Sequence, residues 1–501
     1  VLGNAVRDGL AYAGGSIVLS VQDSAVKTPL VVDHGATLTA DGTQAVFDRM
    51  PARGTTHMAL QATPVVTAGG SIVLNARSGG AVFEGHMSAK GGKLDVLGGA
   101  QAAGGSLALN LVRGAATNGI PEADEVQLIL GKAPFTAPSS NPGKVALWVM
   151  DPQILKTAQF ANASFTSTDR INLSGDAQIE TAGTLSLNAT VLSAGENVRL
   201  QAGTAISLGA PPSSAAKAFT PSGGVGQLFL QAPYIEFAGP QTLQSIGQLR
   251  ATASHEMRLV GTQNVMRAVP GTTAQELDFS KTGSLNTLAD LWLSAPVIAP
   301  ATASSYSLNA PGHRIEFARG DAQATVPYSA LGRIDVNAAH IIQGGVLRAP
   351  FGQIYLNAQQ QLTLQAGSVT SVGALTADGK TPLSLPFGST QGGGKSLTFA
   401  GADINSLTHK TIALNAASGA VAVNPSAKLD MDGGGELLAY EFVPGPGGSR
   451  DVFAGSVKGA FAIVPGLTGF APDDRTMLGI DGASGTEFKK VLGQQITLGA
   501  S

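Results

Sequence analysis

Two copies of one short phrase decide the fold: Gly332-Arg-Ile-Asp-Val-Asn337 and Gly352-Gln-Ile-Tyr-Leu-Asn357, which begin 20 residues apart. In each copy the two aliphatic residues stand two positions apart, so they point to the same side of an extended strand. The residue between them varies, as is typical of an outward-facing position. A period near 20 residues that contains two or three short strands predicts a β-solenoid.

The phrase recurs along most of the chain as a Gly, a polar residue and two aliphatic residues on either side of a variable one. Further copies are Gly15-Ser-Ile-Val-Leu19, Gly70-Ser-Ile-Val-Leu-Asn75, Gly105-Ser-Leu-Ala-Leu-Asn110, Gly183-Thr-Leu-Ser-Leu-Asn188, Gly226-Gln-Leu-Phe-Leu-Gln231 and the degenerate Thr411-Ile-Ala-Leu-Asn415. Gly-rich and Ala-Pro turns separate the copies, and Pro is tolerated at a turn because no ladder hydrogen bond is needed there.

Coils stacked one period apart predict a specific alignment of side chains. The aligned pairs are Ile334 with Ile354, Val336 with Leu356, and Asn337 with Asn357. The aliphatic pairs fill a narrow core. The two Asn side chains are expected to hydrogen-bond each other, because an amide carries both donors and acceptors. We interpret this Asn position as a structural ladder and not as a ligand site.

The composition narrows the class of protein. Charged residues make up 13% of the chain, against about 25% in an average soluble domain. The net charge is −3 and no basic block exists, which argues against nucleic acid as a partner. The chain has no Cys, which excludes disulfides, thiolate metal sites and a Cys nucleophile and suits export through an oxidising periplasm. No signal peptide or long apolar run is found, and we interpret the chain as a fragment.

Three stretches interrupt the repeat: 118–156, 262–290 and 376–394. We interpret them as loop excursions from the solenoid, and short helices suit the first two. From residue 429 onward, Pro and aromatic residues concentrate and the phrase becomes rare. The predicted organisation is therefore an all-β chain, with a parallel β-helix over 1–428 and a small β-rich C-terminal module over 429–501.

The repeated phrase resembles that of the large filamentous-haemagglutinin-type exoproteins of Gram-negative bacteria. The segments Asp432-Gly-Gly-Gly-Glu-Leu-Leu-Ala-Tyr-Glu-Phe442 and Pro444-Gly-Pro-Gly-Gly-Ser-Arg-Asp451 look like an uncharacterised C-terminal region of some of these proteins. The resemblance implies a right-handed β-helix, exported by the two-partner route through an outer-membrane secretion pore. It also implies display at the outer cell surface. The family's N-terminal secretion domain is not in this sequence.

No arrangement of residues predicts catalysis or a cofactor. The seven His residues lie far apart in the sequence, so they form no local zinc motif, and no nucleophile elbow or phosphate-binding loop is present. A carbohydrate-active β-helix of the lyase or hydrolase type needs carboxylates and basic residues gathered from adjacent coils on one face. Arg333 and Asp335, with Arg314 and Glu316 upstream, are the candidates, but Gln353 and Tyr355 take the place of the first two in the next coil.

Two further motifs have a functional and a plain interpretation. Arg319, Gly320 and Asp321 form a receptor-binding tripeptide, but they also suit a turn after the strand that ends at Phe317.

Asp430, Asp432 and Glu436 place carboxylates beside a Gly-rich turn, as at the start of a calcium loop. Their spacing does not meet that of an EF-hand, so ordinary turn chemistry is favoured and no metal is expected.

The sequence favours a secreted structural adhesin or filament scaffold for adhesion, aggregation or biofilm formation, and not an enzyme. The expected partners are further copies of the chain in fibres, a glycan or protein on a host or neighbouring cell, and the secretion pore. The alternative is a carbohydrate-active β-helix enzyme of the polysaccharide lyase or hydrolase type.

Overall fold

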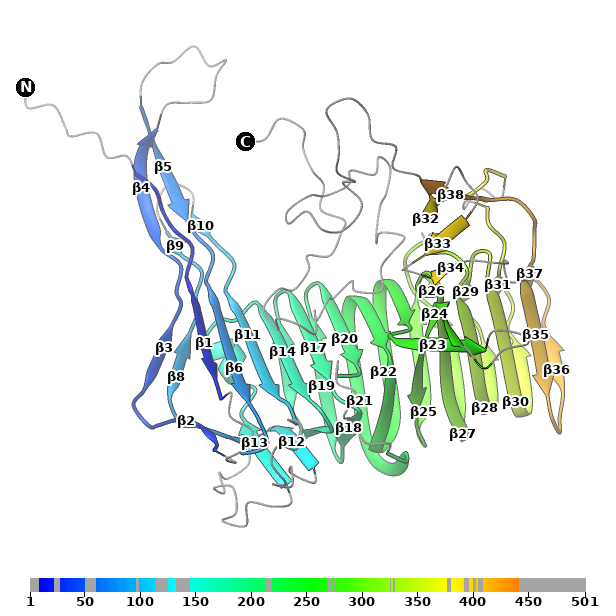
Figure 1. The fold of residues 1–501 in the computed structure, drawn as a ribbon, viewed down its shortest axis with the longest axis horizontal. Helices are drawn as coiled ribbons and strands as arrows, with labels where there is room; N and C mark the ends of the chain where they lie inside the picture. Colours follow the sequence, from blue (N-terminus) through cyan, green and yellow to red (C-terminus); the bar gives the residue numbers. More distant parts are fainter. Residues whose placement is uncertain are drawn as a thin grey trace, which may run out of the picture. The chain divides into compact units, whose positions relative to one another are not determined.

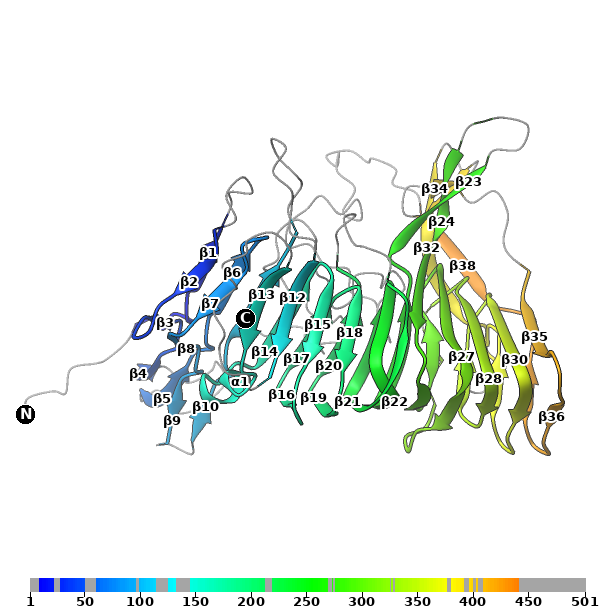
Figure 2. The ribbon, with the colours of Figure 1, turned by 90° about the horizontal axis from the view of Figure 1, so that it is seen from below.

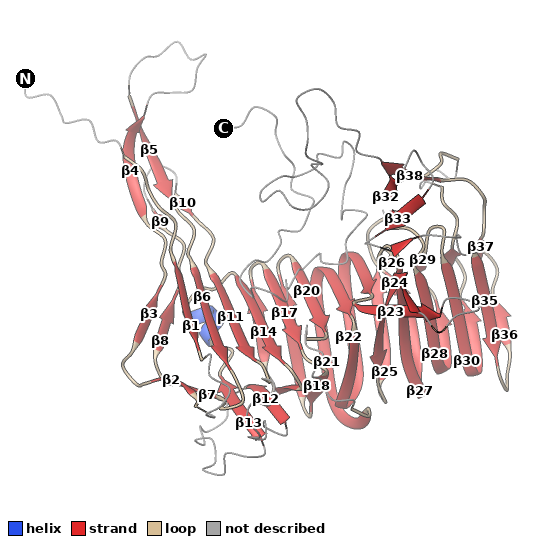
Figure 3. Ribbon diagram, in the orientation of Figure 1, coloured by secondary structure: helices blue, strands red, loops and turns tan. Residues whose placement is uncertain are grey.

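Strands make up most of the described chain, with α1 (Ile154–Thr157) as the one helix in that part (Figure 3). The computed structural model describes residues 9–21, 28–49, 60–95, 99–113, 125–131, 145–211, 219–268, 273, 275–324, 326–327, 329–375, 380–391, 396–399, 402–403 and 409–440. No helix within these ranges has the length and apolarity needed to cross a membrane. The described residues divide into two units: those up to 233 with 242–249, and 234–241 with those from 250 to 440.

In the first unit, parallel strands stack in three columns, here called faces. The first face comprises β1 (Ser16–Ser20), β6 (Ser71–Ala76), β11 (Ser106–Leu111), β14 (Asn162–Ser167), β17 (Thr184–Asn188) and β20 (Ala205–Gly209). The second comprises β2 (Leu30–Val32), β7 (Ala81–Phe83), β13 (Val145–Met150), β12 (Glu125–Leu130), β15 (Arg170–Leu173) and β18 (Val191–Ala194). The third comprises β3 (Thr37–Thr39) with β8 (His86–Ser88), and β16 (Gln178–Thr181) with β19 (Asn197–Ala202) and part of β21 (Ser222–Ala238).

The second unit repeats this arrangement, and Figures 1 and 2 show its strands side by side. Its first face comprises β24 (Gln275–Asn286), β27 (Ser304–Arg319), β28 (Arg333–Gln343), β30 (Gln353–Leu364) and β35 (Thr411–Ala416). Its second face comprises β25 (Asp290–Ala295), the later parts of β27, β28 and β30, and β36 (Val421–Val423). Its third face comprises the last part of β22 (Pro240–Val260), β26 (Ile298–Pro300), β29 (Val346–Arg348), β31 (Val369–Ser371) and β37 (Lys428–Asp430).

The predicted register is confirmed. In β28 and β30, Ile334 pairs with Ile354, Val336 with Leu356 and Asn337 with Asn357. The four aliphatic side chains are completely buried. Alternate residues of these strands are only partly buried, so the period-two pattern separates core from outer face. The parallel β-solenoid expected from the phrase is therefore the fold of the described chain.

Segments inserted between strands of the first face do not disturb its alignment. Side chains that hydrogen-bond across this face come from positions 20, 22 or 23 residues apart where the coil is plain. They come from positions 55 and 58 residues apart where a segment is inserted. An insertion at a corner leaves the strand pairing intact because the ladder bonds involve only the strands themselves.

The stretch 118–156, predicted to be a loop excursion, contributes two strands to the solenoid. It contains β12 and β13, which pair in parallel with each other and join the second face. Their alternate residues Val126, Leu128, Ala146 and Trp148 are buried. A helix was expected here, and α1 does begin within this stretch. It has four residues and lies beside β16.

The helix expected within 262–290 is wrong. Instead, β23 (Gln263–Ala268) pairs with the first part of β24 as an antiparallel hairpin, and the end of β24 continues into the first face.

The stretch 376–394 contributes β32 (Ser384–Gln391) to a separate sheet with β33 (Ser396–Phe399), β34 (Ala402–Asp403) and β38 (Glu436–Tyr440). In the first unit, β4 (Gln44–Arg49) with β5 (Gln61–Val66), and β9 (Lys93–Leu94) with β10 (Ala100–Gln101), form two further hairpins.

The boundary predicted at 429 falls inside a strand. β37 pairs with β31 in the regular register, Val369 with Lys428 and Ser371 with Asp430, so the solenoid continues through Asp430. The first strand beyond it, β38, belongs to the separate sheet. The rest of the predicted module, 441–501, lies outside the described residues.

Candidate functional site

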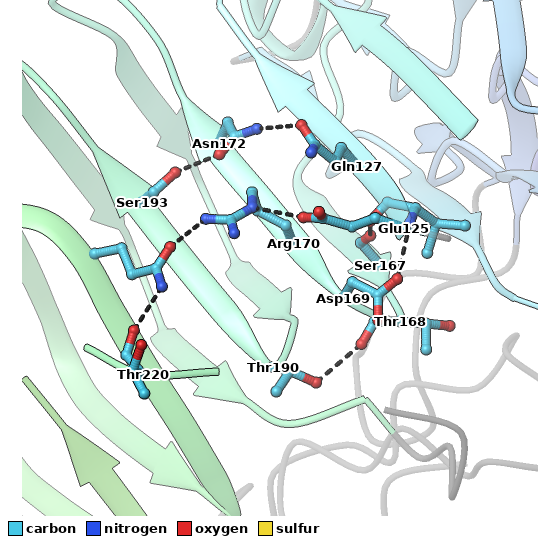
Figure 4. A network of polar contacts seen from close by, with 12 residues as sticks. Glu125, Gln127, Ser167, Thr168, Asp169, Arg170, Asn172, Thr190, Ser193 and Thr220 are labelled. Carbon is cyan, nitrogen blue, oxygen red and sulfur yellow. Dashed lines mark hydrogen bonds and ion pairs between the residues drawn. The ribbon is translucent and has the colours of Figure 1, made fainter. Parts of the chain in front are cut away.

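A buried turn between β14 and β15 of the first unit carries a polar network around Asp169 (Figure 4). The Asp169 side chain is fully buried and accepts hydrogen bonds from the Arg113 guanidinium and from the backbone N–H of Val126, the latter at 2.8 Å. The Arg113 side chain is itself only 10% exposed. A charge pair this deep needs such partners, because an isolated buried carboxylate is strongly disfavoured.

The same turn holds both ends of the segment 114–124. On one side, the Arg113 N–H donates to Thr168 Oγ1 at 2.9 Å. On the other, Ser167 Oγ donates to the Val126 carbonyl at 3.0 Å. We call residues 167–170 the 167–170 clamp, since its side chains bind the residues before and after this inserted segment.

Arg170 extends the network onto the outer face of the same unit. Its guanidinium pairs with Glu125 at 2.8 Å and donates to Gln244 Oε1 at 2.5 Å. It also lies over the Phe219 ring, 5.5 Å from the centroid. Figure 4 shows the side chains of Arg170 and Glu125 directed toward each other across adjacent strands. Glu125 is therefore neutralised by Arg170, and the group braces neighbouring coils.

A continuous ladder of amides runs along the first face of the second unit. Four Nδ2–Oδ1 hydrogen bonds of 2.8–3.1 Å connect five Asn residues, each donating to the one before it: Asn415 to Asn357, Asn357 to Asn337, Asn337 to Asn309 and Asn309 to Asn286. This is the ladder expected at Asn337 and Asn357, extended over five coils. We call it the amide ladder.

Arg333 and Asp335 lie beside the amide ladder. The guanidinium makes two hydrogen bonds of 2.7 Å to the two Asp335 oxygens, and these bonds are the main reason that the pKa of Arg333 is raised. The guanidinium carbon also lies 4.3 Å from the Tyr355 ring centroid. The residues paired with Asp335 in the adjacent coils are Ser307 and Tyr355. The paired positions thus supply no second carboxylate for acid–base catalysis.

The other two candidate catalytic residues lie on the second face. Arg314 and Glu316 form an ion pair at 3.7 Å, with partly exposed side chains. Glu316 pairs in register with Trp292 and Ile342. Arg333, Asp335, Arg314 and Glu316 are therefore divided into two separate ion pairs on different faces.

The tripeptide Arg319, Gly320 and Asp321 starts at the last residue of β27. The Arg319 guanidinium donates to the Gly367 carbonyl, so it is held against the solenoid. The Gly320 N–H donates to the Ala295 carbonyl at 3.0 Å. Asp321 is exposed. Arg319 and Gly320 therefore hydrogen-bond other strands of the solenoid, and Asp321 is the exposed residue of the three.

The three residues considered for calcium have different contacts. Asp430 accepts from Ser371 Oγ at 2.9 Å and from the Asp432 N–H at 3.2 Å. The Asp432 carbonyl accepts from Lys410 Nζ at 2.9 Å, and Glu436 begins β38 in the separate sheet. Within the described ranges, no three or more His, Asp or Glu residues gather in a way that would hold a metal ion.

Sequence reasoning missed the 167–170 clamp. Its partners are 41–56 positions away in the chain, so no local motif connects them. The one local signal is an Asp-Arg pair between two strands in a chain with few charges. Comparison with protein families, with curated proteins and with solved structures found no match.

Proposed function

We propose that this chain is a structural scaffold at the outer cell surface that mediates adhesion, aggregation or biofilm formation. On this proposal, the β-solenoid holds inserted segments in fixed positions and performs no chemistry. The observation that carries the proposal is the unbroken alignment of the first face across insertions. Asn415 hydrogen-bonds Asn357 from 58 positions away with the same geometry that joins Asn357 to Asn337 over 20 positions.

The 167–170 clamp supports this function. Its bonds to Arg113 and Val126 fix the points where the segment 114–124 leaves and rejoins the coils. A stem fixed on both sides limits the conformations of a displayed segment, which lowers the entropy lost when that segment binds a partner.

The use of charge also supports a scaffold. Asp169, Glu125 and Asp335 each face an Arg at hydrogen-bonding distance. A glycoside hydrolase needs two carboxyl groups about 5–10 Å apart. In these pairs the carboxylate instead accepts hydrogen bonds from a guanidinium, as in a structural ion pair.

The proposal includes the cellular route that the filamentous-haemagglutinin resemblance implies: export through an outer-membrane pore to the cell surface. Partners would be a glycan or protein on another cell and further copies of the chain. Fractionation of a producing strain tests the route. Chain found at the surface or in the medium supports it, and chain retained in the cytoplasm overturns it.

The central experiment separates scaffold from enzyme. Beads coated with the purified chain are expected to adhere to bacterial or host cells. The soluble chain should release no reducing or unsaturated ends from pectin or alginate. Release of such ends that is lost in Asp335→Asn would establish the carbohydrate-active alternative. Absence of both adhesion and self-association would remove the adhesive function.

Self-association is the second readout. Outer positions of the phrase include Phe229, Asp335 and Tyr355 and repeat no charge, so few like charges keep two strand faces apart. Association is expected to increase with concentration and to survive moderate salt, because screening weakens only charge pairs. Light scattering across a dilution series, with and without salt, measures this.

A further inference from the structure

Tyr355 is an outer-face aromatic side chain on β30 of the second unit, and the coils on its two sides differ. On one side, the Arg333 guanidinium lies 4.3 Å from the ring centroid. On the other side, the residue paired with Tyr355 in the next coil is Ala413. An Ala side chain is too short to cover a phenol ring. The ring is therefore supported on one face by Arg333, and on the other face its paired position holds the short Ala413.

Arg333 holds this ring in place. Its guanidinium is bound to both Asp335 oxygens at 2.7 Å, which fixes its plane, and a cation over a ring attracts the ring's electron-rich face. An aromatic side chain fixed in advance loses little entropy on binding, which favours its use as a binding platform.

The amide ladder runs beside the ring. Asn357 lies two residues from Tyr355 on the same strand, and Asn415 lies two residues from Ala413. Each Asn uses one of its two Nδ2–H donors in the ladder, so an amide donor stays available at each coil. Asn415 is exposed, and it ends the ladder with an Oδ1 that accepts no hydrogen bond from any described residue.

The charge of this surface selects the partner. Arg333 is matched by Asp335, and the other first-face residues next to Tyr355 are the neutral Gln353, Asn357 and Ala413. An anionic glycan or a nucleic acid would find no unmatched cation here. A neutral sugar ring offers an apolar C–H face for the phenol and hydroxyl groups for the amides.

We propose that Tyr355, Ala413, Asn357 and Asn415 form a binding site for a neutral hexose glycan. The C–H face of one sugar ring stacks on the face of Tyr355 on the side of Ala413. Its hydroxyl groups bond the amides of Asn357 and Asn415. Strands about 4.8 Å apart present these amides at a spacing close to the length of one hexose unit. This inference rests on the proposed adhesive function and names the chemistry of one of its partners.

The test is calorimetric titration of the full chain with cellohexaose, maltohexaose and laminarihexaose, with a galacturonate hexamer as the anionic comparison. At least one neutral hexamer should bind, and the galacturonate hexamer should bind at least tenfold more weakly. Tyr355→Ala is expected to weaken neutral binding at least tenfold, whereas Tyr355→Phe should stay within about twofold. Ala413→Phe should weaken it similarly, because a second ring takes the place of the sugar without removing any contact of Tyr355.

Phe229→Ala is the matched control. Phe229 is an outer-face ring of the first unit, and the cation of Arg199 lies 5.5 Å from its centroid. Two residues further along the paired strands, Gln201 and Gln231 stand where the second unit has the Asn residues of the amide ladder. Binding should be unchanged in this variant. Each variant must keep the wild-type melting temperature, since all the changed side chains lie on outer faces.

Three results would overturn the site. These are no binding of any neutral hexamer, binding that persists in both Tyr355→Ala and Ala413→Phe, and preference for the galacturonate hexamer. If Tyr355→Ala abolishes self-association and leaves hexamer binding unchanged, the occupant of this face is a second copy of the chain. Cell adhesion by coated beads is scored separately, so failure of the glycan site with intact adhesion leaves the scaffold function standing.

Discussion

The two units carry the same strand phrase but use its polar positions in different ways. In the second unit, every paired position of the outer column is Asn, and the amides form an unbroken ladder. In the first unit, the corresponding column is Ser20, Asn75, Asn110, Thr166, Asn188 and Gly209. Among the described residues of this column, the one amide–amide bond joins Asn110 to Asn75. The first unit instead concentrates its polar contacts in the buried 167–170 clamp. The second unit thus connects its coils through one repeated amide hydrogen bond, and the first unit through a single irregular network.

The largest expected effect comes from the feature that both units share, the aliphatic core. Ile354→Asp places a charge where Ile354 is fully buried between Ile334 and Ile412. We expect a loss of about 5 kcal/mol or more in the free energy of unfolding, because a buried unpaired charge has no compensating partner. Urea unfolding followed by circular dichroism measures it.

The neighbouring outer position provides the control for this change. Gln353→Asp puts the same charge one residue away on the partly exposed face and should shift stability by about 0.5 kcal/mol or less. Equal losses in the two variants would show that the alternation of core and outer face is assigned wrongly.

The clamp of the first unit should give the next largest effect. Asp169→Ala leaves the Arg113 guanidinium buried without its partner. The expected loss is about 3–4 kcal/mol, because removing one member of a buried ion pair costs far more than the pair contributes. The exposed pair of Lys93 and Asp95 is the control, and Asp95→Ala should cause no measurable change.

Limited proteolysis gives this prediction a second readout. Since the clamp holds both ends of 114–124, Asp169→Ala should speed cleavage in that segment under conditions where the coils remain folded. A stable variant with an unchanged cleavage rate would mean that the clamp does not fix this segment.

The amide ladder should give a smaller effect that differs between the units. Asn337 takes part in two ladder bonds, to Asn309 and from Asn357, so Asn337→Ala should cost about 1–2 kcal/mol. Asn110 makes one such bond, to Asn75, and Asn110→Ala should cost about half as much. Thermal unfolding of the two variants tests this ratio. A larger loss at Asn110 would contradict the difference drawn between the units.

The same comparison explains how far the sequence predicts this protein. Residues that repeat at a fixed period, such as Ile334, Ile354 and Asn357, reveal their own alignment, because each coil is a copy of its neighbour. The 167–170 clamp is used once, and its partners are assembled only when distant coils stack, so no period shows it. Likewise, the buried alternation of β12 was hidden by the charges and prolines around it. The sequence therefore predicts the contacts that repeat from coil to coil, and it does not predict the contacts that occur only once.

The smallest expected effect is acid sensitivity at the last described coil of the second unit, where Asp430 lies. Burial by itself raises the pKa of Asp430. Hydrogen bonds from Ser371 and the Asp432 N–H, together with the positive charges of Lys428 and Arg348, outweigh burial and lower the pKa below its ordinary value.

A lowered carboxyl pKa contributes stability that is fully present above the pKa of the unfolded chain, near pH 4. That stability is lost as the pH falls through the lower pKa of the folded state. Hydrogen exchange of β37 should therefore accelerate as the pH falls below about 4, after correction for the intrinsic exchange rate. In Asp430→Asn, which keeps the shape without the titrating group, this acceleration should disappear. An equal acceleration in the variant would assign the acid sensitivity to other carboxylates. A clear response in wild-type β37, together with none in β12, would show that the terminal coil of one unit opens independently of the clamped coils of the other.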